Sequence, residues 1–235
     1  MRPRRLLPPD LFPASLLPRE FLTRRLVLDP VLRLTPPTIW APLTEEEWAA
    51  IAPIFAAAKC AQADGPGRPM RDSPRARLDA IFRACTLKRG GLRAPWADLP
   101  PEFGKPDTAS RSHRRWGKAG LWAMLLIAVA RRDRAPVWDG LAYRVCCAFR
   151  RAIRLMGLAG IMLAKRLRMP SALPGPSTWL PDVDLSEIYR EVIRRILSAI
   201  MERPWRPPAW IFRLMRRMLG FAAGRSRIPR WAEPA

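Results

Sequence analysis

The sequence predicts an all-α protein with proline-rich linkers and disordered ends. Apolar residues recur at helical spacing in successive segments, which is the pattern of helices that bury one face. Ser, Thr and Asp residues precede several of these segments, as helix caps do. The 27 prolines of the 235-residue chain cluster between the segments and in both tails, where they end helices and favour extended linkers.

The first expected helix begins after Thr44. Thr44 and Glu47 form a capping box, in which the hydroxyl accepts the Glu47 amide and the carboxylate accepts the Thr44 amide. The buried stripe of this helix is Trp48, Ile51, Ile54 and Phe55. Pro53 lies inside the pattern and predicts a kink or an early end.

A second helix is expected after a loop at residues 59–72. Ser73 caps it, Pro74 takes its first position, and Gly90 with Gly91 ends it. Its inner face holds Leu78, Ile81, Phe82 and Cys85. The turn-rich connection that follows carries three large apolar residues, whose side chains we expect to pack into the core: Trp96, Leu99 and Phe103.

The third expected helix, residues 107–118, has two different faces. We expect Asp107 to cap its start. Basic residues at i, i+3, i+4 and i+7 share one face: Arg111, Arg114, Arg115 and Lys118. Ala109, His113 and Trp116 fall on the opposite face. One side can therefore meet a polyanion while the other packs on a core. A fourth, apolar helix follows over residues 121–132.

After Arg134 the chain predicts three further basic amphipathic helices, at residues 143–169, 184–200 and 209–221. Asp184 and Glu187 form the capping box of the second one. Its apolar stripe is Leu185, Ile188, Val192, Ile196 and Ile200. We therefore expect three regions: a Pro/Arg-rich arm (1–41), a small helical domain (42–134) and a basic helical extension of unassigned role (135–235).

The chain is strongly basic. It has 42 Lys and Arg against 20 Asp and Glu, a formal charge of +22. Such a balance suits a partner with dense negative charge, either nucleic acid or an anionic membrane surface. A second interpretation stays open, because Ala, Arg, Pro and Gly are the residues of GC-rich codons and part of the charge can reflect codon usage.

Cofactor and metal motifs are absent from the sequence. The four cysteines (Cys60, Cys85, Cys146 and Cys147) form no C-x-x-C, and His113 is the one histidine, so neither a zinc site nor any other cofactor is expected. The start of the chain does not read as a signal peptide. The longest apolar runs are about ten residues, whereas a membrane span needs about 20. We therefore expect a cytoplasmic protein with free, buried thiols.

Five pieces of the chain, in order, resemble one bacterial family. They are Leu43–Ile51, Gly67–Pro69, Arg77–Ile81, Pro95–Gly104, and Asp107–Trp116 continuing to Gly120–Trp122. Together they are similar to the amino-terminal domain of insertion-sequence transposases of the DDE type, over about residues 42–132.

The resemblance implies a helix-turn-helix-like module that precedes a catalytic domain of RNase H-like fold. In the family, that catalytic domain carries three acidic metal ligands and cuts and joins DNA. The third helix here would then be the DNA-contacting helix.

This chain departs from the family pattern at two levels. Ala109 and His113 stand where larger apolar residues are usual, which weakens the buried stripe of the third helix. Burying His113 without a partner would cost about 1–3 kcal/mol. No catalytic domain follows Arg134, and the later acids crowd into one helical region: Asp182, Asp184, Glu187, Glu191 and Glu202. A two-metal site needs acids from distant strands, so we expect no enzyme activity.

The candidate DNA-contacting residues follow from the third helix. Arg111, Arg114, Arg115 and Lys118 can contact phosphates, although a solvated helix face would have the same composition. Thr108 and Ser110 near the helix start can touch bases or phosphates, and Arg68 can reach backbone phosphate from its Gly/Pro loop. No catalytic or metal role is expected for His113, which we place in the core.

The leading hypothesis is a non-catalytic, transposase-related protein of a mobile genetic element that binds duplex DNA, for example insertion-element ends. It would be a truncated or split transposase, acting as a homo-oligomer or with a separately encoded catalytic domain. One alternative is a membrane-surface or protein-interaction module built on the carboxy-terminal basic helices, although a membrane partner is not favoured. Another alternative is a degenerate mobile-element remnant without function.

Overall fold

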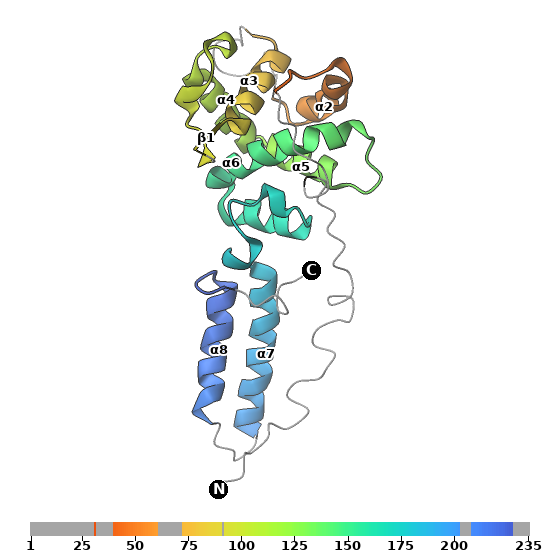
Figure 1. Ribbon diagram of the computed structural model, residues 1–235. Helices are drawn as coiled ribbons and strands as arrows, with labels where there is room; N and C mark the ends of the chain where they lie inside the picture. Colours follow the sequence, from red (N-terminus) through yellow and green to blue (C-terminus); the bar gives the residue numbers. More distant parts are fainter. Residues whose placement is uncertain (1–30, 32–39, 61–71, 91, 203–207, 228–235) are drawn as a thin grey trace. The chain divides into compact units, whose positions relative to one another are not determined.

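The computed structural model describes residues 31, 40–60, 72–90, 92–202 and 208–227. Helices dominate, so the predicted all-α class is confirmed. The described residues divide between two compact units, the first ending at Pro174 and the second beginning at Gly175 (Figure 1). The arm predicted at residues 1–41 lies almost entirely outside the described residues, and so does Arg68.

Helix α2 (Glu45–Ala57) opens with the predicted capping box. The Thr44 hydroxyl accepts the Glu47 amide at 3.1 Å, and the Glu47 carboxylate accepts the Thr44 amide at 3.0 Å. The helix continues past the exposed Pro53 to Ala57, so the predicted early end is wrong. Of its expected stripe, Ile51 and Phe55 are buried, whereas Trp48 and Ile54 are half-buried.

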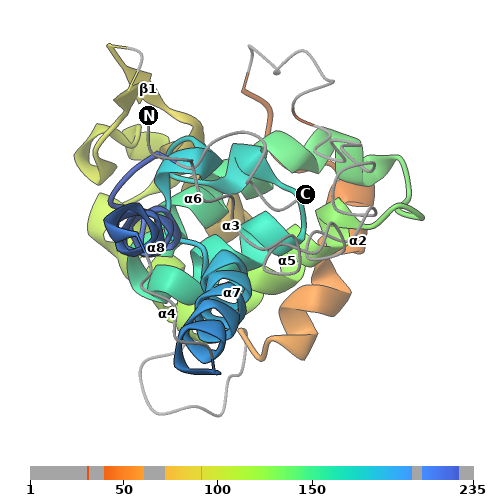
Figure 2. The same ribbon diagram turned by 90° about the horizontal axis from the view of Figure 1, so that it is seen from below.

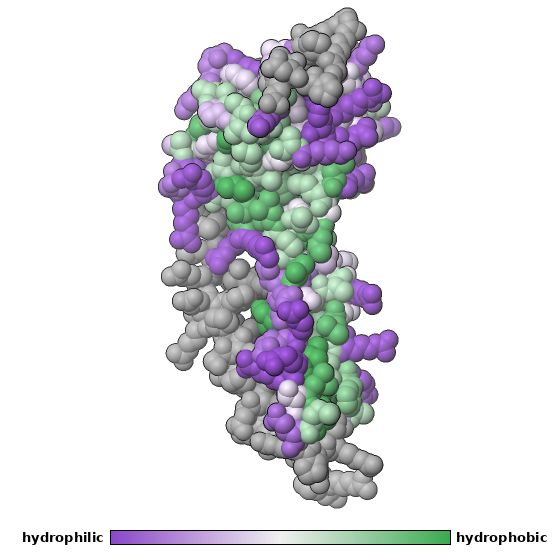
Figure 3. Space-filling model, turned by 180° about the vertical axis from the view of Figure 1, so that it is seen from behind, coloured by the Kyte–Doolittle hydropathy of each residue, from purple (hydrophilic) through white to green (hydrophobic). Residues whose placement is uncertain are grey.

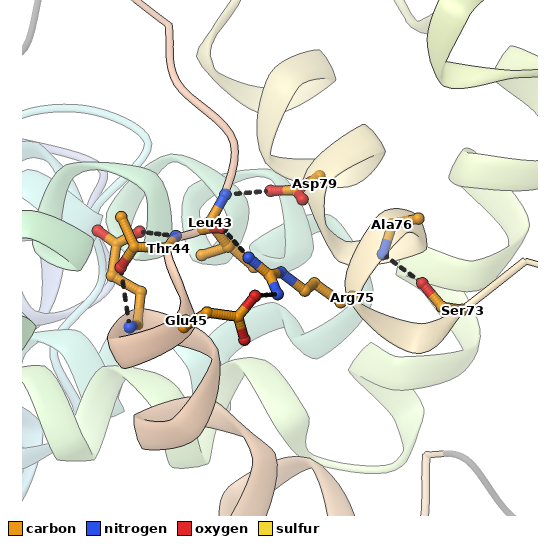
Figure 4. Close-up of polar contacts among 8 residues, drawn as sticks. Leu43, Thr44, Glu45, Ser73, Arg75, Ala76 and Asp79 are labelled. Atoms are coloured by element: carbon orange, nitrogen blue, oxygen red, sulfur yellow. Dashed lines mark hydrogen bonds and ion pairs between the residues drawn. The ribbon is translucent and has the colours of Figure 1, made fainter.

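Helix α3 (Pro74–Thr86) has the predicted Ser73 cap, whose hydroxyl accepts the Ala76 amide at 3.1 Å. All four predicted inner residues are buried: Leu78, Ile81, Phe82 and Cys85. Polar contacts bind α3 to the start of α2 (Figure 4). Asp79 accepts the Leu43 amide at 2.8 Å, and Arg75 pairs with Glu45. These contacts fix the entry of α2 onto the core.

A short β-hairpin follows α3. The helix ends at Thr86 rather than at Gly90, and strands β1 (Lys88–Arg89) and β2 (Leu92–Arg93) pair in antiparallel fashion. Gly90 has a φ of +56°, a backbone conformation that glycine adopts without strain. The predicted end of the helix at Gly90 and Gly91 is therefore wrong, and the hairpin was not predicted.

Two 3₁₀ turns, η4 (Trp96–Asp98) and η5 (Pro101–Phe103), form the next connection. Leu99, between the two turns, is buried in the core, as predicted. Trp96 and Phe103 are only half-buried. Both rings contact other side chains at the edge of the core. The Arg151 guanidinium covers the Trp96 ring at 3.8 Å, and Trp40 lies edge-on to Phe103.

Helix α4 (Pro106–Lys118) begins one residue before the expected cap. Lys105 is its N-cap residue and Pro106 its first residue, so the predicted capping role of Asp107 is wrong. Gly120, with a φ of +86°, turns the chain into α5 (Leu121–Ala130). The apolar residues predicted for α5 are fully buried: Trp122, Leu125, Leu126 and Val129.

Helix α6 (Val137–Arg166) is interrupted at Gly157, where the backbone leaves the helical region. It packs against α2, α3, α4 and α5, and turn η6 (Pro170–Ala172) packs against it in turn. The first compact unit therefore extends to Pro174, well past the boundary that we placed at residue 134. The reason is physical: α6 supplies the apolar face that closes the core of the preceding helices.

The second unit contains turn η7 (Ser177–Trp179) and a pair of helices, α7 (Val183–Glu202) and α8 (Ala209–Ala222). Figure 2 shows α7 and α8 end-on and side by side. Their shared core is Leu185, Tyr189, Val192, Ile196, Ile211, Met215, Met218, Phe221 and Ala222. Asp182 accepts the Leu185 amide at 3.0 Å and so caps α7, two residues earlier than the box predicted at Asp184 and Glu187.

Among the helices that the structure describes, none combines the length and the apolar character needed to cross a bilayer.

Candidate nucleic-acid interface

Helix α4 has the two faces that its sequence predicts. Ala109, His113 and Trp116 are buried to 2% exposure or less. The four basic residues of the opposite face are exposed: Arg111, Arg114, Arg115 and Lys118. Viewed from behind, hydrophilic side chains project from the edge of the first unit that carries α4 (Figure 3). The helix is thus held by one face and presents a cationic surface on the other.

Aromatic packing fixes the orientation of α4. The Trp116 ring meets Phe55 of α2 edge-on, with centroids 4.8 Å apart, and Trp122 of α5 at 6.4 Å. A Cβ at Gly117 would come within 3.2 Å of the Trp122 ring, so a residue without a side chain allows this close approach. A helix locked in this way holds its exposed cations in a fixed register.

His113 has a partner that the sequence did not reveal. Its Nε2 lies 3.1 Å from the carbonyl oxygen of Ala148 in α6, and its ring stacks on Trp122 with centroids 4.9 Å apart. Burial lowers the pKa of His113 to about 4, so the ring is neutral near pH 7 and donates from Nε2 to the carbonyl. The expected penalty for an unpartnered buried histidine therefore does not apply.

The exposed cations of α4 differ in their availability. Arg111 pairs with Asp107 at 2.7 Å, one turn earlier in the helix. This pair is largely exposed and therefore contributes little stability, about 0–1 kcal/mol, so a phosphate can replace the carboxylate. Within the described residues, Arg114, Arg115 and Lys118 have no carboxylate partner.

Two hydroxyl residues predicted near the start of α4 have different exposures. Thr108 is exposed in the first turn and Ser110 is half-buried beside it. Both lie near the amino-terminal end of the helix, where the helix dipole favours anions. The third prediction outside the basic face, Arg68, falls outside the described residues.

A second group of cations, which was not predicted from the sequence, lies around the β1–β2 hairpin. Lys88, Arg89 and Arg93 come from the hairpin, while Arg150, Arg151 and Arg154 come from α6. Two signals in the sequence point toward this group. Gly90–Gly91 between basic residues is a hairpin turn pattern, and the three arginines of α6 share one helix face.

Three carboxylates of the second unit are engaged in local structure. Asp182 caps α7, Glu187 pairs with Arg190, and Glu191 pairs with both Arg194 and Arg195. Within the part of the chain that the structure describes, no group of three His, Cys, Asp or Glu residues is placed to hold a metal ion.

The four cysteines are buried thiols and form no disulfide among the described residues, as predicted. Burial raises the pKa of the Cys60 thiol to about 11 and that of Cys85 to about 12. Both thiols are therefore protonated and unreactive near neutral pH.

The comparison with known protein families identifies the segment that carries α4. Residues 43–126 match the family model described as "Putative transposase of IS4/5 family (DUF4096)". This segment is similar to IS4/5-family transposases. The match agrees with the resemblance drawn over residues 42–132 and covers α2 through most of α5. No curated protein and no solved structure was found to match the chain.

The transposase-like segment does not contain its whole core in this chain. Residues of α6, beyond the matched range, complete it. The Ala148 carbonyl accepts a hydrogen bond from the His113 ring, and Arg144 pairs with Glu47. Arg151 donates to the Ala84 carbonyl at 3.0 Å. The site therefore depends on a helix that the family match does not include.

Proposed function

We propose that this chain is a non-catalytic, transposase-related protein that binds duplex DNA through the exposed face of α4. The observation that carries the proposal is the presentation of four cations along one side of a helix whose other side is locked in a core. The similarity of residues 43–126 to IS4/5-family transposases supports DNA as the polyanion.

The chemistry of the contact is electrostatic. Arg114, Arg115 and Lys118 would bind phosphate oxygens, and Arg111 would exchange Asp107 for a phosphate. Thr108 and Ser110 would contact bases or phosphates near the start of the helix. Each phosphate contact releases counterions, so binding would weaken steeply with salt.

The absence of catalysis is part of the proposal. DNA cleavage by two metal ions needs acidic ligands brought together from separate elements. The acids Asp182, Glu187 and Glu191 instead serve as a helix cap and as local ion-pair partners. We therefore propose a truncated or split transposase that binds element ends, with homo-oligomerisation or a separately encoded catalytic domain. An adjoining reading frame that encodes a three-acid domain would support the split form.

A gel-shift series with the full chain tests the contact. Charge reversal at Arg114 and Arg115 (R114E/R115E) should weaken duplex binding by about tenfold or more, since it removes two phosphate contacts and adds repulsion. The matched control is R131E/R132E, which makes the same charge change at exposed positions after α5. Equal affinity of the two variants would refute the proposed role of α4.

A second candidate function rests on the α7–α8 unit. Its main apolar stripes pack on each other, but large apolar side chains stay exposed: Leu197, Met201, Trp210, Phe212 and Leu219. Figure 3 shows an apolar stripe between hydrophilic side chains along this unit. Such a surface suits a protein partner, or an anionic membrane surface in the style of basic amphipathic helices.

Liposome co-sedimentation separates this second candidate from the first. If the apolar surface binds membranes, F212S/L219S should pellet less with anionic vesicles than the unmodified chain does. R131E/R132E controls for general basic attraction. Failure of the unmodified chain to pellet would remove the membrane form of this candidate. The third hypothesis, a remnant without function, predicts no cooperative unfolding.

A further inference from the structure

We propose that the β1–β2 hairpin and the arginine face of α6 form a second surface that binds DNA phosphates, separate from α4. This inference rests on the proposed function, because it takes duplex DNA as the ligand. It adds a surface that neither the family match nor the α4 hypothesis includes.

The hairpin projects its basic tip from a fixed base. At the base, the Ala94 amide donates to the Leu87 carbonyl at 3.1 Å, and Ala94 is buried. The strand register places Lys88 opposite Arg93. Lys88 and Arg89 near the tip are exposed, so they are free to meet a large ligand such as a DNA duplex.

Helix α6 contributes the second half of the surface. Arg150, Arg151 and Arg154 lie within one turn of the helix, on one face. Arg151 is buried, stacks on Trp96 at 3.8 Å and donates to a carbonyl of α3 at 3.0 Å. Arg150 donates to the Ser171 carbonyl, and Arg154 is exposed. On this helix, Arg154 is therefore the arginine that is exposed to a ligand, whereas Arg150 and Arg151 are held by contacts within the unit.

The cations of the two elements lie close enough to repel one another. The pKa of Arg93 is lowered, first by burial and then by the charges of Arg154 and Arg150. Arg151 of α6 donates to the carbonyl of Ala84, shortly before β1, and stacks on Trp96, shortly after β2, so this part of α6 lies beside the base of the hairpin. In the described structure, the one carboxylate paired with this group is Asp98, 3.7 Å from Arg89. A bound phosphate would relieve this repulsion.

This surface is distinct from the exposed face of α4. His113 lies on the buried face of α4, opposite Arg111 and Lys118, and its ring bonds the Ala148 carbonyl of α6 at 3.1 Å, so α6 packs on the side of α4 away from the exposed cations. Elements β1 and α4 overlap in Figure 1, but Figure 2 separates them. The surface would therefore contact a different stretch of phosphate backbone from the stretch that α4 contacts.

The test measures duplex affinity of the full chain by fluorescence anisotropy at several salt concentrations. We expect K88E/R89E to raise the Kd about tenfold and to reduce the slope of log Kd against log salt by about 2, one for each lost contact. Arg154→Glu should act in the same direction with about half the change in slope. The controls are R131E/R132E and Arg132→Glu, at exposed positions in the connection between α5 and α6, outside both proposed surfaces.

The outcomes separate the hairpin proposal from the α4 proposal. If K88E/R89E binds as tightly as R131E/R132E while R114E/R115E is weakened, the second surface is refuted and the α4 proposal stands. If K88E/R89E is weakened while R114E/R115E matches the control, the hairpin surface stands and the α4 contact fails. If the unmodified chain does not bind duplex DNA, both fail. Equal melting temperatures ensure that a weakened variant is folded, and K88Q/R89Q replaces K88E/R89E if that variant unfolds.

Discussion

At the scale of single residues, the local sequence around His113 predicts its burial but not its hydrogen-bond partner. Its position on the apolar face of α4 predicts burial, and the side chain is 2% exposed. Its partner, the Ala148 carbonyl, lies 35 residues away, and no local pattern identifies such a distant acceptor. The neighbouring Arg114 and Arg115 are different, because helical spacing alone predicts that they face solvent.

His113 should make the first unit sensitive to acid. Its pKa of about 4 in the folded chain lies below the ordinary value of 6.5, so the unfolded chain binds the proton more tightly. Stability is therefore complete above about pH 6.5 and is lost as the pH falls toward 4, by about 3 kcal/mol in total. Urea unfolding followed by tryptophan fluorescence at pH 7, 6 and 5 measures this loss.

The matched variant for that measurement is His113→Leu, which removes the titrating group. The carboxylates titrate in both proteins, so the difference between the two pH profiles isolates the histidine. The unmodified chain should lose more stability than the variant between pH 7 and pH 5. Parallel profiles would contradict the assignment of a buried, neutral His113.

At the scale of elements, periodicity predicted most helices but not what they pack against. The stripes of α3 and α5 were assigned to the core, and every predicted residue is buried there. An amphipathic pattern says that a helix buries a face, yet it does not identify the partner, so α6 was assigned to a separate extension. The strands of the hairpin are two residues each, too short to show a strand period.

The position of α6 in the first unit predicts how fragments of the chain behave. A fragment of residues 40–174 should unfold cooperatively, because it keeps α6 on the other helices. A fragment of residues 40–135 should lack a cooperative transition, since it exposes the apolar face that α6 covers. Circular dichroism melting of both fragments measures this. A sharp transition in the shorter fragment would show that α6 is dispensable.

The core of the α7–α8 pair gives a second prediction at this scale. Ile196 is 2% exposed in that core, whereas Leu197 beside it is 45% exposed. Ile196→Ala should destabilise the pair by about 2–4 kcal/mol, because it removes buried methyl groups and leaves a cavity. Leu197→Ala should cost less than about 1 kcal/mol. Chemical denaturation of the two variants provides the comparison, and equal losses would contradict the described packing.

At the scale of the whole molecule, the formal charge of +22 is spread over different environments. Some arginines are engaged by carboxylates, as Arg190, Arg194 and Arg195 are on α7. Others, on α4 and around the hairpin, stand apart from acids or crowd together. Composition alone left DNA binding and codon usage as equal explanations of the high positive charge, because composition does not show the environment of each arginine. The arrangement of cations on α4 could be predicted from spacing, whereas the fold was needed to show that the hairpin cations lie beside those of α6.

The most direct test of the central claim is the salt dependence of duplex DNA binding by the full chain. If the α4 face binds phosphates, log Kd should rise linearly with log salt, with a slope of about 0.9 per contact. R114E/R115E should lower that slope by about 2 relative to R131E/R132E. A slope and a Kd that are the same for these two variants would contradict the assignment of α4 as the DNA-binding element.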